Sequence, residues 1–210
     1  MPAAFSYSFT FIACLYLAVL SYDFMWLGLI KILPIGVLLV AVYRYTKGVK
    51  RSGLMAALVF SGCGDLLLSF DFFVFGLGAF LVAQVVYGIV FTLNWHSMLT
   101  RWPINIGLLV YMSAMIWILW PALNELKLPV LAYIFAIGFM GVAAIQSNYA
   151  TKLSIVGALT FILSDSLIAV DKFLFTLPYS GIAIMFTYYL AQWLLITSIN
   201  RHTKLNVANL

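Results

Sequence analysis

Long apolar runs fill almost the whole chain, and they constrain its fold more than any other feature. Of the 210 residues, 65% are hydrophobic and only 8% are charged, whereas a soluble domain carries charge on about a quarter of its residues. The mean hydropathy is +1.11. A membrane-spanning helix needs about 20 apolar residues, so a chain of this length has room for about eight spans. The sequence predicts an all-α, polytopic membrane protein.

Charged residues, glycines and prolines divide the apolar sequence into eight runs, and each run is predicted to form one transmembrane helix. Together they make a single transmembrane domain over residues 1–210, so any chemistry falls to side chains on helices or short loops. The predicted spans are Ser6–Tyr22, Phe24–Tyr45, Gly53–Phe70, Phe72–Leu93, Ile104–Trp120, Leu128–Gln146, Leu153–Val170 and Thr176–Ile199.

The distribution of basic residues predicts the orientation. The loop YRYTKGVKRSG, after the second run, holds four of the 11 basic residues, and such loops stay in the cytoplasm under the positive-inside rule. Alternating the spans from this loop places both termini in the cytoplasm, and we expect a bacterial plasma (inner) membrane. Because the charges sort by membrane side, membrane lipids are the expected surroundings and no nucleic-acid partner is expected. The oligomeric state stays open.

An internal repeat carries most of the aspartates. Asp65 and Asp71 recur as Asp165 and Asp171 at an offset of 100 residues, and five of the 11 aligned positions are identical. Because the offset covers four helices, both copies run through the membrane in the same direction. The sequence predicts a 4+4 parallel repeat with a shared site between its halves. The predicted halves are about residues 1–100 and 101–210.

Three ionisable residues are expected inside the membrane. Asp65 and Asp165 each lie 12 residues after the start of their predicted spans, about 18 Å at the rise of a helix, and Lys31 can meet them at that depth. A charge at a helix centre costs about 2.5–3.5 kcal/mol, so a functional site is the favoured interpretation. An Asp–Lys–Asp cluster that only holds helices together is the structural alternative. Asp71 and Asp171 are expected at outer helix ends, as site residues or as helix-end residues.

Further polar side chains are predicted to support this site. Gln84 with Tyr87, and Tyr188 with Gln192, each share one face of a predicted helix. They can donate and accept hydrogen bonds inside a bundle, as a lipid headgroup or a bound water requires. For the tyrosines, simple packing is the alternative.

Several chemistries are excluded by the available residues. The two histidines, His96 and His202, lie near cytoplasmic helix ends, so no zinc set of histidines and carboxylates forms at the level of the aspartates. The motifs of zinc proteases, serine hydrolases and P-loop nucleotide hydrolases do not occur. No metal and no cofactor are expected. The remaining candidate functions are catalysis by a pair of acids and the movement of ions.

Four sequence elements resemble those of a known family. They are FSGCGDLLL at residues 60–68, GALTFILSDSLIA at residues 157–169, KILP at residues 31–34 and YYLAQ at residues 188–192. In this order they are similar to the YhhN/TMEM86 family of lysoplasmalogenases, over nearly the whole chain. The resemblance implies a membrane hydrolase that cleaves the vinyl ether bond of a lysophospholipid substrate, lysoplasmenylcholine or lysoplasmenylethanolamine. The implied products are a fatty aldehyde and glycerophosphocholine or glycerophosphoethanolamine.

The implied reaction fits the acids found in the sequence. Vinyl ether hydrolysis begins with proton delivery to the alkene carbon distal to oxygen, and water then captures the oxocarbenium ion. Our hypothesis is metal-free general acid/base catalysis by Asp65 and Asp165, with the two roles unassigned and with Lys31 holding one carboxylate ionised. The alternative is a proton-coupled transporter of a small molecule or lipid that uses the same aspartates. A ligand sensor without chemistry is a third class.

Overall fold

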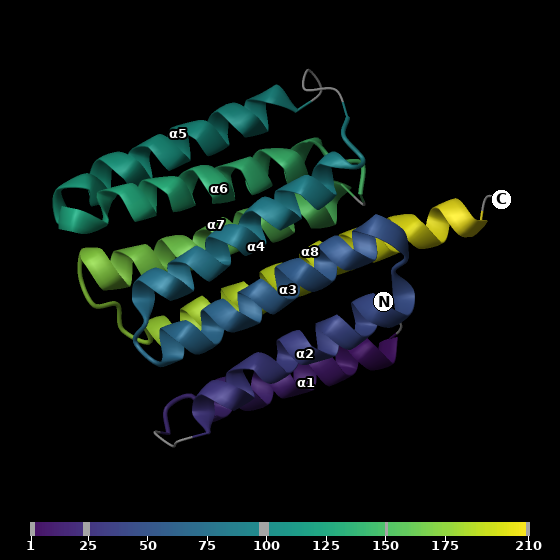
Figure 1. Ribbon diagram of the computed structural model, residues 1–210, viewed down its shortest axis with the longest axis horizontal. Helices are drawn as coiled ribbons and strands as arrows, with labels where there is room; N and C mark the ends of the chain where they lie inside the picture. The colour runs from purple at the N-terminus through teal and green to yellow at the C-terminus, as the bar shows by residue number, and fades with distance from the viewer. Residues whose placement is uncertain (1–2, 23–25, 97–100, 150, 209–210) are drawn as a thin grey trace.

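Eight long helices lie side by side along the long axis of the molecule (Figure 1). The computed structural model describes residues 3–22, 26–96, 101–149 and 151–208. Two short 3-10 turns, η2 (Trp120–Ala122) and η3 (Asn124–Leu126), join the fifth and sixth helices. The helices are α1 (Ala3–Val19), α2 (Leu27–Tyr45), α3 (Gly48–Ser69), α4 (Phe73–Thr92), α5 (Trp102–Leu119), α6 (Lys127–Gln146), α7 (Thr151–Phe173) and α8 (Ser180–Ala208).

The predicted all-α, multi-pass architecture is confirmed, although the count of spans is supported only for seven helices. From α2 to α8, every helix is long and apolar enough to cross a membrane. The remaining helix, α1, has 17 described residues, about 26 Å at 1.5 Å per residue, against about 30 Å for a hydrocarbon core. Both described chain ends lie at the end of the bundle that also holds the α2–α3 loop (Figure 1).

Several helices extend beyond the spans predicted from hydropathy, and α8 ends at Ala208 and not at the predicted Ile199. Helix α3 begins at Gly48, not at the predicted Gly53, and α7 continues to Phe173, past the predicted Val170. Both extensions carry lysine, a good helix former that a hydropathy scan nevertheless leaves out of an apolar span. The basic loop after α2 is therefore largely the first turns of α3.

The start of α8 also differs from the prediction. It begins at Ser180 and not at Thr176, because Pro178 disfavours the helical conformation of the residue before it. The predicted start of the second span, Phe24, lies outside the described residues.

Close helix pairs build the bundle. The α3–α4 and α7–α8 hairpins have extensive contacts, α4 packs against α6, and α2 packs against α3 and α8. One apolar core draws buried residues from all eight helices. Helix α5 lies at the edge, against α6 and α7 (Figure 1).

The helix order agrees with the predicted repeat, which stays a prediction. Helices α2 and α6 begin at Leu27 and Lys127, at the offset of 100 residues seen in the sequence. The rings of Phe73 and Phe173, which that offset pairs, meet edge to face with centroids 5.7 Å apart. Segments far apart in the chain are thereby brought together beside the aspartates.

Gly64 provides a test of the packing between α3 and α4. A Cβ at Gly64 would lie 2.6 Å from the ring of Phe80, which is itself buried, whereas a Cβ at Gly62 would meet its nearest neighbour at 3.8 Å. We expect Gly64→Ala to lower the free energy of unfolding by about 1–3 kcal/mol, because an overpacked core must shift. Gly62→Ala, on the same helix, is the matched control. Thermal unfolding in detergent measures both, and equal melting temperatures would contradict the expected close contact.

Candidate active site

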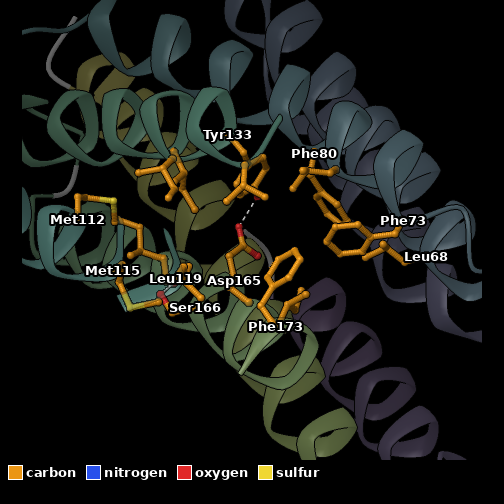
Figure 2. Close-up of a pocket in the computed structure, with 17 residues that line it drawn as sticks. Leu68, Phe73, Phe80, Met112, Met115, Leu119, Tyr133, Asp165, Ser166 and Phe173 are labelled. Atoms are coloured by element: carbon orange, nitrogen blue, oxygen red, sulfur yellow. Dashed lines mark hydrogen bonds between the residues drawn. The ribbon is translucent and has the colours of Figure 1, made fainter. Parts of the chain in front are cut away.

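Two cavities meet inside the bundle. The larger, here called the polar cavity, encloses about 1110 Å³ of empty space, part of it open to the surroundings. The second, here called the apolar cavity, has about 710 Å³ of empty space, part of it also open to the surroundings, and is drawn in Figure 2. Asp165 lines both of them. The titratable residues of the polar cavity include Lys31, Asp65, Asp71, Asp165, Asp171 and Lys172.

Asp65 is a buried carboxyl that is paired with a lysine. It lies on α3, four residues before the helix ends at Ser69, and is 2% exposed. The Lys31 Nζ atom, from α2, lies 3.5 Å from the Asp65 Oδ1 atom and donates to the Asp65 carbonyl oxygen at 3.4 Å. The Tyr189 hydroxyl donates to the Lys31 carbonyl oxygen at 2.7 Å, which ties α8 to α2. Among the described residues, the Asp65 Oδ2 atom has no hydrogen-bond partner.

Asp165 has a different environment. Its Oδ2 atom accepts a hydrogen bond from the Tyr133 hydroxyl of α6 (Figure 2). Within the described part of the chain, the one ion pair between side chains is Lys31–Asp65, so Asp165 has no cation at that range. The apolar cavity beside it is lined largely by aliphatic and aromatic side chains. The two aspartates therefore share the polar cavity but differ in their partners.

The predicted supporting residues divide into two groups. Tyr188 lines the polar cavity next to Asp65. Gln84, Tyr87 and Gln192 are fully buried behind the cavity wall, where the Tyr87 hydroxyl donates to the Gln192 Oε1 atom at 2.5 Å. These three residues line neither cavity, so they lie behind the residues that form the cavity walls.

The two outer aspartates line the polar cavity at its helix ends. Asp171 Oδ1 accepts the backbone N–H of Leu177 at 2.7 Å, a bond that holds the α7–α8 loop. Asp71 is exposed and has a φ of 61° in the turn between α3 and α4. A left-handed backbone is tolerated by aspartate better than by most residues. Lys172 places its Nζ atom 5.3 Å from the Phe73 ring centroid, at the same cavity.

The sequence predicted that Asp65 and Asp165 lie at equal depth in the membrane, and the observed helix bounds do not support this equality. Asp65 lies 17 residues after the start of α3 and four before its end, whereas Asp165 lies 14 after the start of α7 and eight before its end. The sequence estimate placed each of them 12 residues from the start, because it began both helices at their first apolar residue. Both carboxyls nevertheless reach the polar cavity.

Tyr133 was missed by the sequence reasoning. A single tyrosine in an apolar helix usually serves packing, and it has no counterpart in the repeated segments. Its hydrogen bond to Asp165 comes from the packing of α6 against α7. Its signal in the sequence was a lone hydroxyl in the middle of an apolar span.

The Lys31–Asp65 pair leads to a test of stability. Removing one partner of a buried ion pair leaves an uncompensated charge, at a cost of about 3–5 kcal/mol. We expect Lys31→Met to lower the free energy of unfolding by that order, and Asp65→Asn in the same chain to restore part of the loss. Thermal unfolding of the three variants in detergent measures the effect. A double variant no more stable than Lys31→Met would show that the pairing is not the cause.

Comparison with known proteins finds a matching family and relatives that are named lysoplasmalogenases. It matches the YhhN family over residues 26–199. It is 36% identical over 190 residues to the lysoplasmalogenase TMEM86A of Bos taurus, covering 81% of this chain and 77% of that protein. For the lysoplasmalogenase TMEM86B of Sus scrofa the identity is 32% over 186 residues, covering 86% and 78%. For a lysoplasmalogenase of Mycobacterium bovis it is 31% over 157 residues, covering 70% and 60%. No solved structure matches the chain.

Proposed function

This chain belongs to the YhhN family, and on that premise we propose that it is a membrane hydrolase that cleaves the vinyl ether bond of lysoplasmalogens. The products are a fatty aldehyde and glycerophosphocholine or glycerophosphoethanolamine. The names of its relatives support this substrate. The observation that carries the proposal is the position of Asp165, a carboxyl at the junction of a polar and an apolar cavity.

The two cavities suit the two ends of a lysolipid. The glycerophospho headgroup occupies the polar cavity, where Lys172 is exposed and available to the phosphate. The hydrocarbon chain begins in the apolar cavity, because burying it among aliphatic side chains is favourable and burying the headgroup there is not. The vinyl ether joins these two parts of the molecule. It therefore lies beside Asp165.

Asp165 is proposed as the general acid. A carboxylate without a cation beside an apolar cavity is expensive, so the neutral acid is the form that this environment favours. Tyr133 occupies the Oδ2 atom as a donor, which leaves the Oδ1 atom to carry the proton. That proton is delivered to the alkene carbon distal to the ether oxygen. The product of this step is an oxocarbenium ion.

Asp65 is proposed as the base that activates water. Its pairing with Lys31 favours the ionised form, and its Oδ2 atom is available to a water molecule in the polar cavity. Water adds to the carbon that carries the ether oxygen and gives its proton to Asp65. The hemiacetal collapses as its hydroxyl proton passes to the glycerol oxygen. Proton transfer through the shared cavity from Asp65 to Asp165 restores the starting state, and no step uses a metal.

The membrane orientation is part of the proposal. The basic residues of the α2–α3 loop and the first turn of α3 gather at one end of the bundle, so this end is placed in the cytoplasm. Both chain ends are then cytoplasmic, and the polar cavity opens toward the opposite side of a bacterial inner membrane. The 4+4 repeat would place the polar cavity between the halves, where Asp65 and Asp165 meet it.

A paired-substrate assay tests the function. Purified protein is incubated with a lysoplasmalogen and with its saturated alkyl-ether analogue, and aldehyde release is measured. We expect aldehyde from the vinyl ether alone, since an alkyl ether has no alkene to protonate. Asp165→Asn is expected to lower kcat by about 10²–10⁴-fold, the usual contribution of general acid catalysis, and Asp65→Asn also to lower it.

The matched control is Glu125→Gln, which removes an acid that lines neither cavity. It is expected to keep the activity of the unaltered protein. If folded protein released no aldehyde, the proposal would be wrong, and proton-dependent uptake into vesicles would favour the alternative of a proton-coupled transporter. Near-normal turnover by both aspartate variants would overturn the mechanism while leaving the activity.

Tyr133→Phe tests the orientation of the acid. Losing one hydrogen bond frees the Asp165 carboxyl to rotate, so we expect kcat to fall about tenfold, equivalent to about 1.4 kcal/mol. KM is expected to change little, because Tyr133 does not carry the headgroup. Steady-state kinetics on the lysoplasmalogen measures both constants. An unchanged kcat would remove Tyr133 from the mechanism.

A further inference from the structure

A second apolar space, here called the α5–α7 groove, lies beside the apolar cavity. It is lined by Ile104, Gly107, Leu108 and Tyr111 of α5 and by Leu159, Ile162 and Leu163 of α7. Helix α5 is the least enclosed of the long apolar helices: 17% of its most apolar stretch is buried, against 28–61% for the others. The groove thus lies between α7 and α5, and α5 is at the edge of the bundle (Figure 1).

The groove and the apolar cavity are parts of one seam. Ile162 lines both spaces. The Tyr111 hydroxyl, from the groove, lies 2.8 Å from the Ser166 Oγ atom, from the cavity, and this hydrogen bond joins α5 to α7 between them. Ser166 in turn donates to the Ile162 carbonyl oxygen at 2.7 Å. The two spaces therefore meet at a single polar link in an otherwise apolar wall.

The lengths of these spaces decide what each can hold. On α7, Asp165 lies three residues after Ile162, which lines both the cavity and the groove, so a chain that runs from Asp165 toward the groove has only about 4–5 Å of cavity beside it. The hydrocarbon of one bilayer leaflet is about 15 Å deep, half of the core, so a lipid tail outreaches the cavity. The groove continues along α7 to Leu159, six residues or about 9 Å from Asp165. A lipid tail that runs this way therefore passes beyond the cavity and lies in the groove.

We propose that the α5–α7 groove binds the part of the substrate's single hydrocarbon chain that lies beyond Ile162 and is the lateral route by which that chain enters from the membrane. This rests on the proposed function, which places the vinyl ether at Asp165 and the start of the chain in the apolar cavity. From Asp165 the chain runs past Ile162 toward Leu159, into the groove. The occupant is a hydrocarbon chain, because a polar group would find few hydrogen-bond partners along this largely apolar wall.

Gly107 allows the groove to be filled without disturbing the fold. A Cβ at Gly107 would meet no atom within 4 Å, and the same holds for Gly36 on α2, which lines none of the three spaces. Replacing either glycine within a helix also removes a residue of poor helix propensity. Gly107→Phe and Gly36→Phe therefore form a matched pair, of which only the first places a ring in the groove.

The kinetic test compares two chain lengths. With an octadecenyl lysoplasmalogen, Gly107→Phe is expected to lower kcat/KM about tenfold, the scale on which lost hydrophobic contacts change specificity. With a butenyl analogue, whose tail ends before the groove, both variants are expected to match the unaltered protein. Equal losses for the two substrates, or no loss for either, would overturn the proposal while leaving vinyl ether hydrolysis intact.

A second measurement does not depend on turnover. A saturated octadecyl-ether lysolipid with a diazirine at the sixth carbon of its chain is bound to the unaltered protein and photolysed, and the labelled residues are located by mass spectrometry. We expect the label on the groove residues of α5 and α7, and competition by unlabelled lysolipid but not by a diacyl phospholipid. Labelling spread over lipid-facing helices, or equal competition by the diacyl lipid, would assign the groove to ordinary membrane lipid and overturn the proposal. Groove labelling without any aldehyde release would instead defeat the proposed function alone.

Discussion

A charged carboxyl buried in an apolar bundle needs a partner, and the Lys31–Asp65 pair meets that requirement where the site is built. Asp65 is 2% exposed, and the lysine lies 3.5 Å away on a neighbouring helix. The pairing fixes α2 against α3, while Tyr189 fixes α8 against the backbone of Lys31. Three helices are thus held together at the floor of the polar cavity. An isolated charge at this position would be disfavoured by several kcal/mol.

The same pair makes the two aspartates unequal. Asp65 has a cation, whereas Asp165 has a tyrosine hydroxyl and an apolar cavity. Acid/base chemistry at neutral pH uses such differences, because one carboxyl must keep its proton while the other stays charged. The repeated sequences around Asp65 and Asp165 do not distinguish the acid from the base. We therefore infer which residue has which role from the surroundings of each carboxyl.

The substrate proposal depends on the same boundary between polar and apolar surroundings. A lysolipid has one polar end and one apolar chain, and the bond to be cleaved lies where they meet. Asp165 faces both cavities, so a molecule divided in this way brings its reactive bond to the carboxyl without a dedicated binding domain. The groove along α5 then accounts for a chain longer than the cavity.

Local pattern was enough to predict most of the fold. Apolar runs of helical length identified the helices, because backbone groups in lipid must be paired within a helix. The predicted helix boundaries were wrong where charged residues continue a helix, as in the first turns of α3 from Gly48, and where Pro178 shifts the start of α8 to a later residue. The repeated aspartates and Lys31 identified the polar part of the site, because ionisable residues are costly in an apolar helix and so stand out.

Tertiary structure decided what those residues face. The Tyr133–Asp165 bond joins two helices whose sequences give no sign of pairing, and Gln84, predicted to support the site, is buried and does not line the polar cavity. The apolar cavity is lined largely by residues that the sequence does not distinguish from those of the core or the lipid-facing surface. The sequence by itself determined that the chain is helical and apolar and where its ionisable groups occur, because these are properties of single segments. Which carboxyl is paired and where a chain can lie depend on contacts between segments, and only the packed helices determine them.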